Sequence, residues 1–178
     1  MALYTSQIAV YPANVNTDDV VEAEFMKLSA KDPEGLRQLG LKCLERKPTI
    51  EGVPFMKKSA TKTDYGIIIA GPNFGCGSSR EQAPYALAES GVYVIVAPSF
   101  APIFWRNTFE SGIHLKLRTS ENDLTSRLKT GQTGTFDYDE NKILVGGFSI
   151  ALLPLSNLDK TLEREEGLLN YAEKHFSF

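Results

Sequence analysis

Short apolar runs alternate with amphipathic segments through the middle of the chain. Each apolar run is too short for a helix and is followed by a turn and then by apolar residues at helical spacing. These patterns predict strands at 66–70, 92–97 and 113–117, and helices at 84–90, 99–110 and 121–129. Strands and helices in alternation are typical of a parallel sheet that is covered by helices.

The segments on either side predict further strands of a different kind. A first strand is expected at 7–11, and two runs at 133–138 and 142–145 are joined by Asp-Glu-Asn, which predicts an antiparallel hairpin. A sheet with both parallel and antiparallel strands accommodates all of these segments. We therefore expect one α/β domain over residues 1–178, built on a mixed sheet.

Three other segments have weaker patterns. Turn-forming residues at 14–19 predict a loop, and residues 30–63 show no sustained periodicity beyond a short helix at 36–46, which is typical of a mobile or partner-dependent stretch. From Leu158 onwards the apolar spacing predicts an amphipathic helix that is interrupted at Gly167.

Composition narrows the class of protein. The chain has 178 residues, of which 42% are hydrophobic and 23% charged, and its net charge is −3. A chain of this size and composition buries enough apolar surface to fold, and it has no clustered cations for a phosphate backbone and no apolar run of roughly 20 residues for a membrane span. We expect a protein that binds neither nucleic acid nor membrane. Its first residues lack the order of a secretion signal, which predicts a cytoplasmic location.

The residues that most often bind metals are few. Cys43, Cys76, His114 and His175 are the only cysteines and histidines, and their spacing matches no metal site. We therefore expect no metal to be bound by this chain alone.

The most informative stretch is a glycine-rich turn, Gly-Pro-Asn-Phe-Gly-Cys-Gly-Ser-Ser-Arg-Glu-Gln-Ala-Pro, at 71–84. It follows a predicted strand and precedes a predicted helix, and Gly75 and Gly77 allow the positive φ of a loop that lies close to a ligand. Cys76 lies between them, either as a reactive thiol or as a small buried residue.

The spacing of polar residues also predicts how the next helix begins. Ser78 with Glu81, or Ser79 with Gln82, has the spacing of a capping box, and Pro84 suits an early helical position. A capped helix after a tight turn is the plain structural explanation of this stretch.

The functional explanation is an anion site. Backbone amides at a helix N-terminus attract anions, and the Arg80 guanidinium matches a carboxylate, so a substrate carboxylate is the natural ligand. The same field would stabilise a Ser78 alkoxide, which could act as a base or as a nucleophile. A serine hydrolase would additionally need His114 or His175 beside Ser78.

Residues 73–84 resemble the Asn-Phe-Gly-Cys-Gly-Ser-Ser-Arg-Glu-His-Ala-Pro motif of the small subunits of 3-isopropylmalate dehydratases, in the aconitase superfamily, and differ from it only at Gln82. Residues 14–21 are similar to that family's Asp-Thr-Asp turn, and Ser-Phe-Ala-Pro-Ile-Phe-Trp-Arg-Asn at 99–107 is similar to its Ser-Phe-Ala-Arg-Ile-Phe-Tyr-Arg-Asn segment.

This resemblance implies a swivelling β/β/α three-layer domain, like the last domain of aconitase, with a mixed sheet. It implies half of an active site, completed by a large subunit that carries a four-iron four-sulfur cluster. The reaction implied is the dehydration and rehydration of a 2-hydroxy acid in leucine biosynthesis. By position Ser78 matches the family's serine base, Ser79 and Arg80 match residues that hold a substrate carboxylate, and Lys27 falls near the specificity segment, where a cation would meet a second carboxylate.

Three departures from the family pattern leave alternatives open. Gln82 replaces a histidine, Asn16 replaces the first aspartate of the turn, and Pro102 replaces an arginine at the start of a helix that Ser99 is expected to cap. The substrate could therefore be isopropylmalate, the homoaconitase substrate, or another alkylmalate or citramalate. From a different class, a noncatalytic assembly module would also retain the anion-binding loop.

Overall fold

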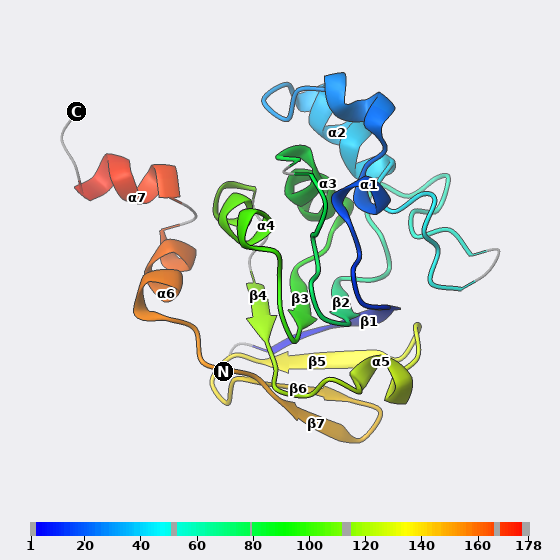
Figure 1. Ribbon diagram of the computed structural model, residues 1–178, viewed down its shortest axis with the longest axis vertical. Coiled ribbons are helices and arrows are strands. Elements are labelled where there is room, and N and C mark those ends of the chain that lie inside the picture. The colour runs from blue at the N-terminus through cyan, green and yellow to red at the C-terminus, as the bar shows by residue number, and fades with distance from the viewer. Residues whose placement is uncertain (1–2, 51–52, 79, 112–114, 166–167, 176–178) are drawn as a thin grey trace.

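The computed structural model describes residues 3–50, 53–78, 80–111, 115–165 and 168–175, and these form a seven-stranded mixed sheet (Figure 1). The strand order is β4-β3-β2-β1-β5-β6-β7. The strands are β1 (Leu3–Tyr11), β2 (Ile67–Ala70), β3 (Val94–Ala97), β4 (Leu115–Arg118), β5 (Thr133–Asp137), β6 (Lys142–Val145) and β7 (Phe148–Ala151). The expected mixed α/β sheet is confirmed, including the β5–β6 hairpin.

Strand β1 joins the two halves of the sheet. Its first part pairs antiparallel with β5, from Leu3 opposite Asp137 to Gln7 opposite Thr133. Its last part pairs parallel with β2, from Ile8 opposite Ile67 onwards. Figure 1 shows the result, in which β5–β7 cross below the upright strands β2–β4.

In Figure 1 the helices before residue 111 lie over the upper end of the parallel strands, whereas the later helices lie beside the antiparallel strands or to the left of the sheet. They are α1 (Thr17–Val20), the 3₁₀ turn η1 (Ala23–Lys27), α2 (Pro33–Leu41), α3 (Gln82–Ser90), α4 (Pro102–Asn107), the 3₁₀ turn η2 (Thr108–Glu110), α5 (Leu124–Arg127), α6 (Asn157–Arg164) and α7 (Leu168–His175). No described helix has the length and apolar character needed to cross a membrane.

Two apolar clusters form the core, one on each face of the parallel strands. Alternate residues of a strand point to opposite faces, so neighbours such as Ile67 and Ile68 enter different clusters. Ile68 packs with Leu39 and Leu87 beneath the helices, whereas Ile67 packs with Ile143 between the two halves of the sheet. These layers hold the ends of the parallel strands, and the loops that follow them, in fixed positions.

Several elements differ from the sequence-based expectations. The loop predicted at 14–19 contains α1, because the Asn16 side chain accepts from the Asp19 amide at 2.7 Å and the Asp19 carboxylate accepts from the Asn16 amide at 3.0 Å. Strand β7 was not predicted, and it follows a turn in which Gly146 and Gly147 have φ of +55° and +84°. The helix predicted at 121–129 is only one turn long, and Gly167, the predicted break between α6 and α7, lies outside the described residues.

Tyr11, at the end of β1, is buried with a hydroxyl that has no hydrogen-bond partner among the described residues. Burial raises the pKa of Tyr11, so the phenol stays neutral. Because an unsatisfied buried polar group is costly, Tyr11→Phe is expected to raise the free energy of unfolding by about 1 kcal/mol. Urea denaturation at equilibrium measures this change, and a variant less stable than the parent would contradict the expectation.

Candidate functional site

The candidate site lies where the loops after three parallel strands meet. In the loop after β1, the Val15 carbonyl accepts a hydrogen bond from the Gly75 amide at 2.8 Å, and the Thr17 amide donates to the Cys76 carbonyl at 2.9 Å. In the loop after β3, the Ser99 carbonyl accepts a hydrogen bond from the Phe74 amide at 3.1 Å. Ligands of open α/β sheets bind at this carboxyl edge of the strands. The glycine-rich loop after β2 is therefore fixed on both sides at the edge where a site is expected.

Two glycines give this loop its path, as predicted. Gly75 and Gly77 have φ of +79° and +91°, in the left-handed region that favours glycine. A Cβ atom on Gly75 would lie 2.1 Å from Cγ of Phe104, so the loop also packs directly against α4. The loop depends on glycine for its conformation at both positions and for its packing at one.

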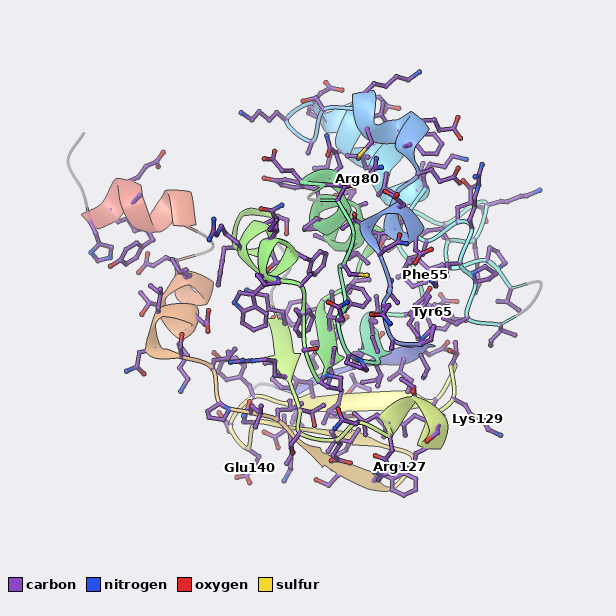
Figure 2. The ribbon with its side chains drawn as sticks, viewed as in Figure 1. Phe55, Tyr65, Arg80, Arg127, Lys129 and Glu140 are labelled. Carbon is purple, nitrogen blue, oxygen red and sulfur yellow. The ribbon has the colours of Figure 1, made fainter. Side chains whose placement is uncertain are left out.

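Ser78 and Arg80 lie together at the end of the loop. The Ser78 carbonyl accepts from the Thr17 hydroxyl at 2.6 Å, which holds the backbone while the side chain is exposed. Nε of Arg80 donates to Oγ of Ser78 at 3.0 Å and also contacts a carboxylate oxygen of Asp18 on α1. The Arg80 side chain, labelled in Figure 2, is only 19% exposed, so its guanidinium is held in place. The structure thus brings these two predicted site residues into contact.

Asp18 is a site residue whose contact with Arg80 the sequence pattern did not predict. It lies 57% exposed on α1, and its position in the Asn-Thr-Asp turn was the only signal in the sequence. A carboxylate next to a guanidinium shows that this position suits an anion.

The predicted capping interactions are wrong. Helix α3 begins at Gln82, and its cap residue, Glu81, makes no side-chain cap hydrogen bond, because Ser78 lies too far upstream and its Oγ accepts from Arg80. Ser79, the other predicted cap and a predicted carboxylate ligand, lies outside the described residues.

Helix α4 likewise begins without the predicted serine cap. Ala101 is its cap residue and makes no side-chain hydrogen bond, and Pro102 occupies the first turn as expected. The Ser99 hydroxyl instead accepts from the Asn73 amide at 2.9 Å, so it braces the glycine-rich loop.

A cavity of about 190 Å³ is lined by residues of the loop and of the start of α4. Its lining includes Cys76, Ser78 and Arg80 on the loop, and Ile103 and Asn107 on α4. Cys76 is half-buried there, so it is neither fully exposed nor a core residue. The cavity is smaller than the roughly 300 Å³ that is common for complete ligand pockets, and Ile103 at its rim is 52% exposed. One wall of a site is present on this chain.

Lys27 and Gln82 are not among the residues that line this cavity. Lys27 ends η1 with an exposed side chain. The Gln82 amide donates to the Met26 carbonyl at 3.2 Å, and this bond ties the start of α3 to η1. Gln82 therefore positions the segment that carries Lys27.

The described residues contain no group of three potential metal ligands. Cys43 is fully buried, and burial raises the pKa of its thiol to about 12, so it stays protonated. His175, on α7, packs against the Tyr171 ring with centroids 4.4 Å apart and does not line the cavity, while His114 lies outside the described residues. No described histidine therefore lies beside Ser78 as a hydrolase would require.

Comparison with known proteins agrees with this geometry. Residues 13–122 match the model of the aconitase C-terminal domain. The chain is 34% identical over 173 residues to the 3-isopropylmalate dehydratase small subunit of Syntrophus aciditrophicus, covering 96% of each protein. It is 36% identical over 165 residues to 3-isopropylmalate dehydratase small subunit 1 of Arabidopsis thaliana, and there it spans 65% of the relative's length.

A solved structure of a related protein is also similar to this chain. The crystal structure of 3-isopropylmalate dehydratase LeuD from Methanocaldococcus jannaschii superposes with a TM-score of 0.77 and 28% identity, over 97% of this chain and 95% of that one. The fold that the resemblance implied is therefore confirmed. With its loop motif, its fold, and one relative and one solved structure that it matches along nearly their whole length, the chain belongs to the aconitase C-terminal domain family, among the 3-isopropylmalate dehydratase small subunits.

Proposed function

We propose that this chain is the small subunit of a hydro-lyase that isomerises 2-isopropylmalate to 3-isopropylmalate, by dehydration and rehydration, in leucine biosynthesis. The observation that carries the proposal is the contact between Nε of Arg80 and the exposed Oγ of Ser78 at the rim of the cavity. A small subunit acts with a large subunit, and the single cavity wall on this chain suits such a division of the site.

In this proposal Ser78 is the base. A hydroxyl that accepts a hydrogen bond from a guanidinium loses its proton at a lower cost in free energy, because the cation stabilises the alkoxide. Oγ of Ser78 would take the proton from the carbon next to the departing hydroxyl and return a proton when water adds back. The exposed side chain leaves Oγ accessible to a substrate that enters the cavity.

Arg80 and Ser79 bind a substrate carboxylate in this proposal. Among the described residues the contacts of Arg80 run through Nε, so its two terminal amino groups are available to a carboxylate. Glycines at 75 and 77 let the backbone beside Cys76 approach the substrate closely. Lys27, on the segment that Gln82 holds, would meet a second carboxylate.

A four-iron four-sulfur cluster does not fit the residues of this chain. Such clusters are held by several cysteine thiolates, whereas the chain has two cysteines, and the raised pKa of buried Cys43, about 12, opposes its ionisation. We therefore assign the cluster to the large subunit and derive no step of this chain through it.

We also propose that residues 1–178 act as one swivelling domain and that the enzyme works in the cytoplasm. The continuous sheet, in which β1 pairs with both halves, supports the first point. The proposed function in amino-acid biosynthesis suits the second.

Reconstitution with the cluster-bearing large subunit of the same organism tests the function. The pair is expected to interconvert 2- and 3-isopropylmalate, whereas the large subunit alone should not. The same assay with citramalate, other alkylmalates and the homoaconitase substrate separates the alternatives. A loaded pair that turns over none of these acids would contradict the proposal and favour an assembly module.

Arg80→Lys is expected to raise KM at least about tenfold, because lysine keeps the charge but loses the planar pair of donors, and a charge-assisted hydrogen bond contributes roughly 1.5–3 kcal/mol. Steady-state kinetics of the reconstituted pair measure the effect. Arg37→Lys is the matched control, since Arg37 pairs with Glu34 on the surface of α2. An unchanged KM for Arg80→Lys would remove Arg80 from the carboxylate site.

A further inference from the structure

Two arginines of this chain differ from the others in their partners. The structure describes the side chains of six arginines, and four of them form ion pairs: Arg37 with Glu34, Arg46 with Glu22, Arg80 with Asp18, and Arg127 with Glu121. Arg106 and Arg118 have no carboxylate partner among the described residues, although the chain carries 22 acidic residues against 19 basic ones. Both side chains are exposed.

These two arginines line the same cavity, of about 430 Å³. Its walls come from α4, β4 and the start of α6, and we call it the arginine groove, defined by Arg106, Arg118, Trp105 and Phe109. The guanidinium carbon of Arg118 lies 5.4 Å from the centroid of the Trp105 ring. The groove thus presents two exposed arginines, one of which has its guanidinium above an aromatic ring.

The groove has further positive charge beneath it and one carboxylate at its edge. Lys116 is buried under the same rings, with Nζ 5.0 Å from the Trp105 centroid and 3.5 Å from the Phe109 centroid. The carboxylate of Asp159 accepts from the Ser156 hydroxyl at 2.8 Å and from its amide at 3.3 Å, so it is engaged at the start of α6. No carboxylate among the described residues pairs with the two exposed arginines, which leaves them for an external anion.

The groove is continuous with the candidate site. Pro102 lines both cavities, while Ile103 of α4 lines the site and Arg106 of the same helix lines the groove. A partner that covered the open side of the site would extend over exposed Ile103 towards the groove. Arginine and tryptophan are enriched where protein interfaces bind most strongly.

We propose that the arginine groove is a docking site for the large subunit and receives the carboxylate of an aspartate or glutamate side chain of that subunit. This inference rests on the proposed function, because it takes the large subunit as the partner. Two guanidinium groups match a carboxylate with paired hydrogen bonds, and partial burial by the partner strengthens them. The groove and the candidate cavity share Pro102, so docking there would help close the site.

The first test compares the affinity of the large subunit for variants of the full chain. Arg106→Gln with Arg118→Gln removes both charges and keeps most of the shape, and it is expected to raise Kd about tenfold or more at low salt. Arg127→Gln is the matched control, because Arg127, on α5, is paired with Glu121, and Figure 1 shows α5 far from α4. Thermal melting of each free variant shows whether it is folded. A folded double variant with a Kd within twofold of the control would overturn the inference.

The second test uses Trp105, the only tryptophan of the chain, as a reporter inside the groove. In chain labelled with 5-fluorotryptophan, the single ¹⁹F resonance is expected to shift when unlabelled large subunit is added. A complex that forms without this shift would overturn this inference and leave the proposed function standing. A large subunit that does not bind the wild-type chain at all would overturn the proposed function as well.

Discussion

Ser78→Ala is expected to lower kcat of the reconstituted enzyme by about 10²- to 10⁴-fold, because it removes the group proposed to move the proton. The side chain is exposed, and Thr17 holds its backbone through the carbonyl, so the substitution leaves the loop's other contacts in place. The assay is the interconversion of 2- and 3-isopropylmalate followed in both directions, with assembly of the pair checked by gel filtration.

Ser126→Ala serves as the control for this experiment. Ser126 is an exposed serine on α5 whose hydroxyl donates to the Asp123 carbonyl, and it does not line the candidate cavity. The control should retain normal turnover. If the Ser78 variant assembled and turned over at the control rate, Ser78 would not be the base, and the anion site would need another catalytic group.

Gly75→Ala is expected to lower the free energy of unfolding by about 3 kcal/mol, the largest stability effect that we predict. The new Cβ would lie 2.1 Å from Cγ of Phe104, and overpacking a buried contact costs roughly 1–3 kcal/mol. The φ of +79° adds a penalty of about 1–2 kcal/mol for a residue with a side chain. Equilibrium urea denaturation gives the change.

Gly77→Ala separates the two causes. Gly77 has a similar φ of +91°, but a Cβ there would lie 3.4 Å from its nearest neighbour, Cβ of Asn16. Its cost is therefore expected to be the conformational part alone, about 1–2 kcal/mol. Equal losses in the two variants would show that packing against Phe104 contributes nothing.

The central strands of the parallel half could be predicted because β2 and β3 are short, continuous apolar runs. All four residues of β2 and of β3 are buried, which matches their continuous apolar sequence. Helix α1 and strand β7 were missed for a different reason. Each has four residues, and each is fixed by local geometry, a side-chain capping box in one and a two-glycine turn in the other, which periodicity does not detect.

The candidate site was predictable in its chemistry but not in its contacts. The loop motif pointed to Ser78 and Arg80, and the structure brings them together. The loop motif could not reveal that Asp18 contacts Arg80, because the two residues are distant in the sequence and meet only when the loops after β1 and β2 lie side by side. The capping prediction failed because the spacing of serine and glutamate says nothing about where α3 begins.

The double pairing of β1 has a consequence for how the chain reaches its folded state. Thr5 on β1 lies opposite Thr135 on β5, 130 positions later in the chain. Contacts so distant in sequence raise the contact order and slow folding, since a long loop must close before they form. During synthesis on the ribosome, this edge of β1 therefore stays unpaired until residues 133–137 have emerged, and the nascent chain is exposed to aggregation during this interval.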